Sequence, residues 1–335
     1  MHLKKNDKPT NPYQKSGNKN LVRFLLLSII GLVALIVYLQ THAGDSNLVK
    51  SNEQDLKKEL AGHVEKEKHL SDQLKEAHEE KLAAEQSRHE LELQLRGSKD
   101  KHGKASIHSG GETKDVKEMQ NSMDLIAKKI DKLEVDMQKK AKKEIIAKFG
   151  LGPHRVKIEL GFNPEEVPDG TATSFTIELA PIDLMPYTVN HFLQQVSLGL
   201  WNGCSFHRNA HHVVQGGPIA NYLNPGAKVS AGFKKADLGS VVFQEYHKDF
   251  PHKKYTLGYA GRPGGPDFYI STVDNTRNHG PGGQSSYAMK GEADPCFAKV
   301  IEGFEAIDRM HTLSVQPGDY NRLNHYVAIK SATII

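Results

Sequence analysis

The sequence predicts a mainly β domain in its C-terminal half, preceded by a transmembrane helix and a helical coiled-coil stalk. Three observations predict this arrangement: an apolar run at residues 21–39, heptad-spaced apolar residues within residues 47–149, and short runs of period two from Val156 onward. The chain has 335 residues, of which 38% are hydrophobic and 25% are charged, so we expect a folded core within a polar chain. We therefore expect four parts, at residues 1–20, 21–40, 45–149 and 153–335.

Positive charge gathers before the apolar run. Residues 1–20 contain five lysines and a single aspartate, and Arg23 is the only charged residue between Leu21 and Leu39. The run has the length of a short membrane-spanning helix, and the positive-inside rule places the basic tail in the cytosol. We expect a single-pass type II membrane protein of the secretory pathway, in the endoplasmic reticulum or the Golgi, with the β domain in the lumen. The alternative is a signal peptide cleaved near Ala43 and a secreted protein.

The stalk contains two helical segments joined by a linker near residues 97–113, which is rich in Gly, Ser and charge. In the first segment charged residues share the heptad core positions with leucines, so this coil is poorly specified. The second segment has seven consecutive apolar core positions, which are Val116, Met119, Met123, Ile126, Ile130, Leu133 and Met137. So narrow an apolar stripe on a polar helix needs a partner. We expect the same helix of another copy, giving a homo-oligomer (a dimer or a trimer). The alternative is a single helix folded back on its own domain.

Charge and cysteine content argue against several classes of protein. A formal net charge of +4 gives no case for a nucleic-acid binder. The two cysteines, Cys204 and Cys296, are too few for a disulfide scaffold and lack the C-x-x-C spacing of a zinc site, and the sequence leaves open whether they pair. The Gly-rich segment at residues 278–295 lacks the G-x-x-x-x-G-K-[ST] pattern of a phosphate-binding loop. We predict no cofactor and no metal site.

The composition changes near Gly150, where the second helical segment ends. Two period-two runs predict strands, at residues 156–162 and 172–180. A helix is expected at residues 185–201, because Pro186 lies near its start and apolar residues recur along one face. Further strands are expected at residues 211–215, 255–260, 267–272 and 296–301. A second helix is expected at residues 303–313, and a final strand at residues 325–335. This order lacks the regular alternation of a parallel α/β fold, and it favours an antiparallel sheet or a closed barrel with two helices.

Several motifs, taken in order, resemble one family. The chain contains FTIELAPIDLMPYTVNHFLQQVSLGLWNGCSFHR, followed by VVQGGP, then LGYAGRPGGPDFYIST and finally DPCFAKVIEGFEAIDRM. These segments are similar, in sequence and in order, to segments of the cyclophilin-type peptidyl-prolyl cis-trans isomerases. The resemblance covers about residues 154–335, and it implies a closed eight-stranded antiparallel barrel capped by two helices.

The resemblance implies Arg208 as the catalytic residue and Gln215 as the residue that binds the peptide backbone. Rotation about an X-Pro bond has a barrier of about 20 kcal/mol, because resonance gives the bond double-bond character. In the twisted transition state the prolyl nitrogen gains a lone pair. A fixed cation that donates a hydrogen bond to this nitrogen stabilises the twisted form over the planar ones, without a covalent step or a metal. Arginine suits this role because its fork is planar and always charged.

The proline pocket departs from the family pattern. His212 and Val213 stand where the family has phenylalanine and methionine, and Asp267 stands where it has glutamine. Asp294 replaces a histidine, and the family's tryptophan after the later strand has no counterpart. The residues that the resemblance implies for substrate binding are Phe206, His212, Val213, Gln215, Tyr259, Asp267 and Tyr269.

The predicted function is cis-trans isomerisation of X-Pro bonds in proteins of the secretory pathway, assisting their folding, with proline-containing polypeptides as partners. The alternative is a weakly active or inactive module that binds proline peptides on a membrane-tethered coiled-coil scaffold. The polar pocket favours this alternative, because an apolar ring gains less from burial against polar groups. A metal site at His207, His211 and His212 is disfavoured, since adjacent residues on a strand point to opposite faces. We expect His207 to pack beneath the sheet.

Overall fold

The computed structural model describes residues 65, 68–84, 86–87, 114–165, 167, 173–283 and 292–335. The predicted cytosolic tail, transmembrane helix and stalk linker lie outside these residues, as do the side chains of Val116 and Met119 in the seam. The chain divides into two compact units, Met1–Lys68 and His69–Ile335, and the elements below belong to the second. In the described part of the chain no helix is long and apolar enough to cross a membrane. The anchor therefore stays a prediction.

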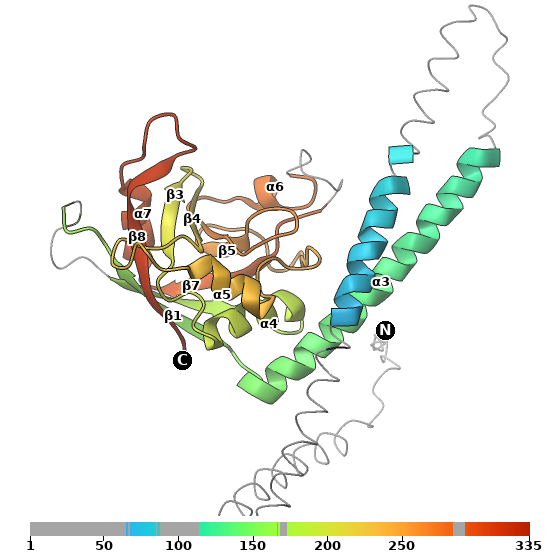
Figure 1. Ribbon diagram of the computed structural model, residues 1–335, viewed down its shortest axis with the longest axis horizontal. Coiled ribbons are helices and arrows are strands. Elements are labelled where there is room, and N and C mark those ends of the chain that lie inside the picture. Colours follow the sequence, from blue (N-terminus) through green and yellow to red (C-terminus); the bar gives the residue numbers. More distant parts are fainter. Residues whose placement is uncertain are drawn as a thin grey trace, which may run out of the picture. The chain divides into compact units, whose positions relative to one another are not determined.

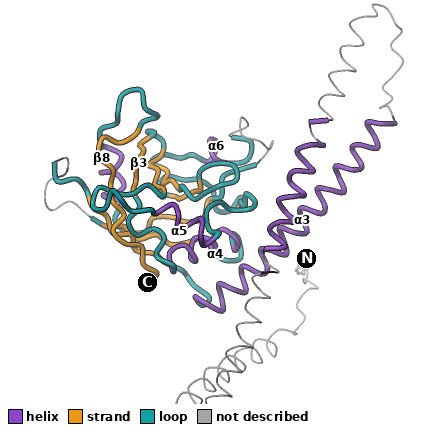
Figure 2. The backbone as a smooth tube through the Cα atoms, in the orientation of Figure 1, coloured by secondary structure: helices purple, strands orange, loops and turns teal. Residues whose placement is uncertain are grey.

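Eight antiparallel strands close a barrel (Figure 1, Figure 2). They are β1 (Arg155–Gly161), β2 (Ser174–Leu179), β3 (Ser205–Asn209), β4 (Val213–Gly217), β5 (Thr256–Tyr259), β6 (Phe268–Ser271), β7 (Cys296–Glu302) and β8 (Arg322–Ile334). Their order around the barrel is β1-β2-β7-β5-β6-β4-β3-β8, and β8 pairs with β1 to close it. The predicted closed eight-stranded barrel is confirmed. Because β4 lies between β3 and β6, this topology brings three separate motifs of the sequence side by side.

The helices of the barrel domain are α4 (Pro186–Ser197), α5 (Val229–Ala236), α6 (Thr276–His279) and α7 (Phe304–Thr312). The helices α4 and α7 are the two that the sequence predicts. Pro186 lies in the first turn of α4, where its missing N–H costs no helical hydrogen bond. The apolar face of α4 is fully buried at Val189, Phe192 and Leu193. The sequence does not predict α5 and α6, because both are too short to show an apolar period.

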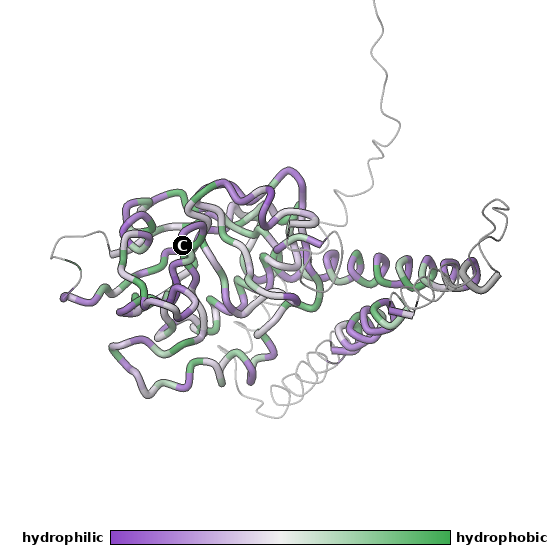
Figure 3. Tube along the Cα trace, turned by 90° about the horizontal axis from the view of Figure 1, so that it is seen from above, coloured by the Kyte–Doolittle hydropathy of each residue, from purple (hydrophilic) through white to green (hydrophobic). Residues whose placement is uncertain are grey.

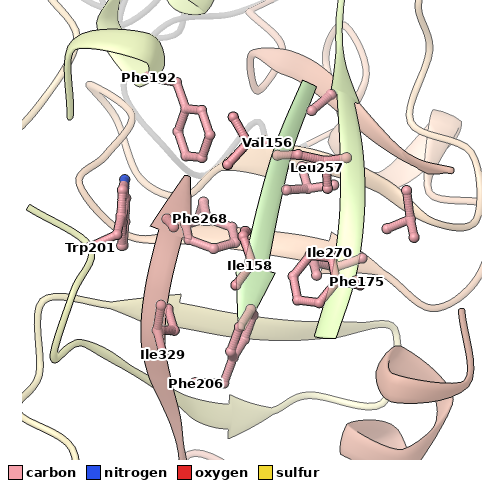
Figure 4. Close-up of a cluster of buried hydrophobic side chains, with 14 of the residues drawn as sticks. Val156, Ile158, Phe175, Phe192, Trp201, Phe206, Leu257, Phe268, Ile270 and Ile329 are labelled. Carbon is pink, nitrogen blue, oxygen red and sulfur yellow. The ribbon is translucent and has the colours of Figure 1, made fainter. Parts of the chain in front are cut away.

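The barrel encloses an apolar core (Figure 4). Side chains of β1 alternate between core and solvent: Val156, Ile158 and Leu160 are buried, while those between them are exposed. The strands β5 and β6 are buried at every position. The ring of the fully buried Trp201 lies 4.8 Å from the Phe268 ring in an edge-to-face contact. Burial of each large apolar side chain contributes about 1.5–3 kcal/mol to stability, so this core holds the strands in register.

The apolar seam of the second stalk segment is covered within the chain. The helix α3 (Lys114–Phe149) is continuous, and hydrophobic and hydrophilic residues alternate along the long helices (Figure 3). Ile130 and Met137 are buried in a cluster with Leu74, which lies in the helical residues 68–84, and with Phe243 of the barrel domain. This is the arrangement of the alternative, in which the helix folds back on its own domain. Self-association of copies through the seam stays a prediction.

A buried carboxylate joins α3 to the barrel domain. Glu245 Oε1 accepts hydrogen bonds from Gln138 Nε2 of α3 at 3.0 Å and from the Tyr187 N–H at 3.2 Å. Glu245 Oε2 accepts a hydrogen bond from the Thr188 N–H at 2.7 Å. Both N–H groups belong to the first turn of α4, where backbone donors have no partner within the helix. Burial raises the pKa of Glu245 to about 7, although these hydrogen bonds favour its charged form.

Replacing Ile130 by aspartate is expected to lower the free energy of unfolding by about 3 kcal/mol, because the change places a charge inside an apolar cluster. Leu125→Asp is the matched control, since Leu125 lies on the same helix and is 67% exposed. Urea denaturation of both variants and of the wild type measures the difference. Equal losses in the two variants would contradict the packing of α3 described above.

The raised pKa of Glu245 predicts that stability depends on pH. Its folded-state pKa of about 7 exceeds the ordinary value of 4.5, so the folded state binds the proton more tightly than the unfolded state does. The resulting stabilisation is complete below the ordinary pKa and is lost as the pH rises through the folded-state pKa, a change of at most about 3 kcal/mol. We therefore expect the free energy of unfolding to fall between about pH 5 and about pH 8.

In Glu245→Gln this fall should be smaller than in the wild type. Burial also raises the pKa of Glu134 to about 7, so part of the slope should persist in the variant. Glu305→Gln is the control, because Glu305 is exposed. Denaturation at a series of pH values measures all three proteins. A slope that is the same in Glu245→Gln and in the wild type would show that the Glu245 carboxylate does not titrate as described.

Candidate active site

A break in strand pairing positions the candidate catalytic arginine. Between Phe206 and Arg208 the pairing with β4 advances by one residue, from Gly216 to Gln215, so His207 is an extra residue relative to β4. The pairing of β3 with β8 is also irregular here, because it passes from Val327 directly to Arg322. A bulge of this kind bends the strand and redirects its side chains. Beyond it, Arg208 pairs with Gln215 of β4 and with Arg322 of β8. Consecutive residues of a regular strand point to opposite faces, but here His207 and Arg208 both contribute to one polar cluster.

Arg208, Gln215 and Asp267 form a chain of hydrogen bonds across three strands. Arg208 Nη1 donates to Gln215 Oε1 at 2.9 Å, and Gln215 Nε2 donates to Asp267 Oδ2 at 2.8 Å. Arg208 Nε donates to the carbonyl oxygen of Tyr320 at 2.9 Å. These two bonds from Arg208 run in different directions and fix the plane of its guanidinium group. Its other N–H groups make no hydrogen bond within the described residues, so they can donate to a bound molecule.

Asp267 lies between a glycine and a histidine. A Cβ atom at Gly217, the last residue of β4, would overlap the Asp267 carboxylate, so the glycine leaves the space that this carboxylate occupies. His207 Nε2 lies 3.6 Å from Asp267 Oδ2. Burial lowers the pKa of His207 below its ordinary value, although the charge of Asp267 acts in the opposite direction. The imidazole is therefore neutral at neutral pH, and its buried ring faces the carboxylate.

The predicted proline pocket is polar and nearly closed. Val213 and Tyr269 lie side by side, and each is only 2% exposed. The Tyr269 ring lies 4.6 Å from the His279 ring, which stacks in turn against the His212 ring at 5.4 Å. The half-buried His212 has its Nδ1 atom 2.8 Å from the carbonyl oxygen of Ala210. The structure thus brings together the predicted pocket residues His212, Val213 and Tyr269, and the His279 imidazole packs against Tyr269.

Asp294 is the common hydrogen-bond acceptor beneath this pocket. Its Oδ2 accepts from the Tyr269 hydroxyl at 2.8 Å and lies 2.6 Å from His279 Nδ1, and its Oδ1 pairs with Arg262 Nη1. Burial alone would raise the pKa of Asp294, but the hydrogen bond of His279 and the charge of Arg262 lower it below its ordinary value. Nothing in the sequence pattern singles out His279 or Arg262 as members of this cluster. The only signal was Asp294 itself, an acidic residue next to an apolar strand.

Two residues of the predicted substrate-binding set are core residues. Phe206 and Tyr259 have no exposed surface. The Phe206 ring lies 5.5 Å from the Phe268 ring (Figure 4), and the Tyr259 hydroxyl donates to Gln195 Oε1 at 2.9 Å. Both side chains therefore stabilise the barrel and contribute no surface to a groove.

The two cysteines and the histidines form no further centre in the described residues. Cys204 and Cys296 are both buried, and both are free thiols. No group of three or more His, Cys, Asp or Glu side chains in the described ranges is arranged to hold a metal ion.

Comparisons with known proteins were made for the whole chain. A family model described as cyclophilin type peptidyl-prolyl cis-trans isomerase/CLD matches residues 168–334. Among solved structures, the chain is similar to a cyclophilin type peptidyl-prolyl cis-trans isomerase of Cryptosporidium parvum, with 18% identity and a TM-score of 0.38, over 54% of this chain and 97% of that one. A cyclophilin from Hirschia baltica shows 16% identity and a TM-score of 0.36, over 55% of this chain and 74% of that one. None of the curated proteins compared matches the chain.

The family model begins before β2 and extends to the end of β8. It therefore includes all the strands that carry the Arg208–Gln215–Asp267 network, and α3 and β1 precede it. Through residues 168–334, the chain belongs to the cyclophilin-type peptidyl-prolyl cis-trans isomerase family, of which it is a divergent member.

Proposed function

We propose that this domain catalyses cis-trans isomerisation of X-Pro bonds in polypeptides. The observation that supports this most is the fixed guanidinium group of Arg208, held by Gln215 and by the Tyr320 carbonyl. A preorganised cation needs no rearrangement when charge develops beside it. As the bond twists, the prolyl nitrogen gains a lone pair, and a remaining N–H group of Arg208 donates to it. The planar amide nitrogen offers no such lone pair, so this interaction favours the transition state over both ground states.

Gln215 holds the polypeptide next to the bond that rotates. Its Oε1 accepts from Arg208, and one of its two Nε2 hydrogens is donated to Asp267. The second hydrogen is directed away from these partners and can donate to a carbonyl oxygen of a bound peptide. When the peptide is held on one side of the X-Pro bond, the other side can rotate while the prolyl nitrogen stays next to the Arg208 guanidinium. The reaction requires this relative placement of the bond and the cation.

The second candidate function is binding of proline-containing peptides with little or no turnover. The specific observation behind it is the polar, nearly closed pocket, where Tyr269 is 2% exposed and lies against the His279 ring. A proline ring reaches Tyr269 only after neighbouring side chains move. Once there, it gains less free energy from contact with imidazoles than from contact with apolar groups. Such a pocket lowers affinity for proline without altering the arginine.

We also propose a location and partners for the domain. The lysines of residues 1–20 and the apolar run at residues 21–39 support a single membrane anchor with the barrel in the lumen of the secretory pathway. Proline-containing polypeptides of that compartment are the proposed clients. The apolar seam of α3 supports self-association only where a second copy displaces the contacts that cover Ile130 and Met137 within the chain.

Arg208→Ala is expected to lower kcat/KM by about a hundredfold, because a charged hydrogen bond in a shielded site contributes about 3 kcal/mol to the barrier. Arg208→Lys should recover little of this, since a flexible point charge does not reproduce the planar fork. Arg322→Ala is the matched control, as Arg322 is the paired arginine on the neighbouring strand. Isomerase assays on a series of X-Pro peptides measure the rates. Equal losses in Arg208→Ala and Arg322→Ala would remove Arg208 from its proposed role.

His212→Phe is expected to raise kcat/KM on Ala-Pro peptides about fivefold, mainly through a lower KM, because an aromatic ring buries more apolar surface than an imidazole does. The half-buried position accepts the larger side chain with little strain. The same peptide series in the isomerase assay measures the change. If Arg208→Ala abolishes activity but His212→Phe leaves KM unchanged, the polar pocket does not limit the reaction.

A further inference from the structure

The Gln215 side chain lies between a cation and an anion. Its oxygen accepts from Arg208, and its nitrogen donates to Asp267. The oxygen and nitrogen of an amide have nearly the same shape, so packing alone does not determine which of them faces Arg208. An ionised carboxylate only accepts hydrogen bonds, and a guanidinium only donates them. Only the orientation with the Gln215 oxygen toward Arg208 and the nitrogen toward Asp267 satisfies both partners. In the reversed orientation the amide N–H groups would face the N–H groups of Arg208, and the amide oxygen would face the carboxylate oxygen of Asp267.

Asp267 is itself held in a fixed place. It directly precedes β6, and its carboxylate occupies the space that the missing side chain of Gly217 leaves at the end of β4. The bond between Gln215 Nε2 and its Oδ2 measures 2.8 Å, and His207 Nε2 approaches the same oxygen to 3.6 Å. The position of the Asp267 carboxylate beside Gln215 is therefore set by contacts with residues of β3 and β4 and by its place directly before β6.

We propose that Asp267 is a positioning residue for the Arg208–Gln215 pair, and that it fixes the Gln215 amide with its oxygen toward the guanidinium. This inference rests on the proposed isomerase function. Asp267 touches neither the proline nor the bond that rotates. It acts through Gln215, which in turn holds one side of the Arg208 guanidinium while the Tyr320 carbonyl holds the other. The orientation of the Gln215 amide and that of the Arg208 guanidinium therefore depend on each other.

His207 connects this network to pH. The groups that face it are Asp267, Arg208, Arg322 and the Tyr326 ring at 6.3 Å. Burial lowers the pKa of His207, the charge of Asp267 raises it, and the charges of the two arginines lower it further. When His207 is protonated, its Nε2–H competes with Gln215 for the Asp267 oxygen, and the amide loses the bond that orients it. Isomerase activity should therefore fall as the pH drops below the ordinary pKa of histidine.

The test compares three variants of the full-length protein. Asp267→Ala removes the acceptor, and Asp267→Asn keeps an acceptor oxygen but removes the charge and the constraint on orientation. Asp319→Asn is the matched control, because Asp319 Oδ2 lies 3.5 Å from Nε of Arg322, the arginine paired with Arg208. Two readouts are taken: kcat/KM as a function of pH on one X-Pro peptide, and the NMR signals of the Gln215 side-chain amide without peptide.

We expect Asp267→Ala to lower kcat/KM about tenfold, mostly in kcat, and Asp267→Asn to lower it less. Both should shift the Gln215 amide signals, speed their exchange with water and abolish the acid limb of the pH profile, whereas Asp319→Asn should do none of these. Unchanged Gln215 signals in Asp267→Ala would overturn the proposal, even with a loss of thermal stability. If the wild type shows no isomerisation but its Gln215 signals respond to Asp267→Ala, the positioning role holds and the isomerase function fails.

Discussion

The extra residue at His207 in β3 is the constraint on which the candidate site depends. His207 is the extra residue relative to β4, and on the other side the pairing of β3 passes from Val327 directly to Arg322 of β8, so the register changes here on both sides. Without it, His207 and Arg208 would point to opposite faces of the sheet. With it, Arg208 reaches Gln215 while His207 reaches Asp267, and the three strands that carry these residues are joined by side chains as well as by backbone hydrogen bonds. Closure of the barrel then leaves no free edge along which this arrangement could slip.

The polar pocket is a second consequence of how the barrel is filled. Tyr269, His279 and Arg262 each direct a polar group at Asp294, so one buried carboxylate joins three side chains. The His279 ring of this cluster packs against Tyr269, a residue of the proposed proline pocket. The domain therefore combines an intact arginine centre with a pocket that has little apolar surface to offer.

The sequence predicts the barrel because strand alternation and the order of the motifs are local signals. The resemblance to the family also assigns Arg208 and Gln215 to one site, but the sequence does not show that the two side chains pair. It does not show which side of a strand faces inward near a bulge, and so Phe206 and Tyr259 are included in the groove although they lie in the core. A heptad seam shows that an apolar partner is needed but not which one. Here the partners of Ile130 include Leu74 and Phe243, which are distant in the sequence.

We propose that Arg208 makes this barrel an isomerase despite the polar pocket. Exchange NMR on an X-Pro peptide, with a catalytic amount of the full-length protein, tests it most directly because it observes the cis and trans forms themselves. Uncatalysed interconversion takes about 10–100 s at room temperature. The account predicts exchange cross-peaks that build up well within that time and scale with protein concentration. Peptide signals that shift on binding, with an exchange rate no faster than in free peptide, would contradict it.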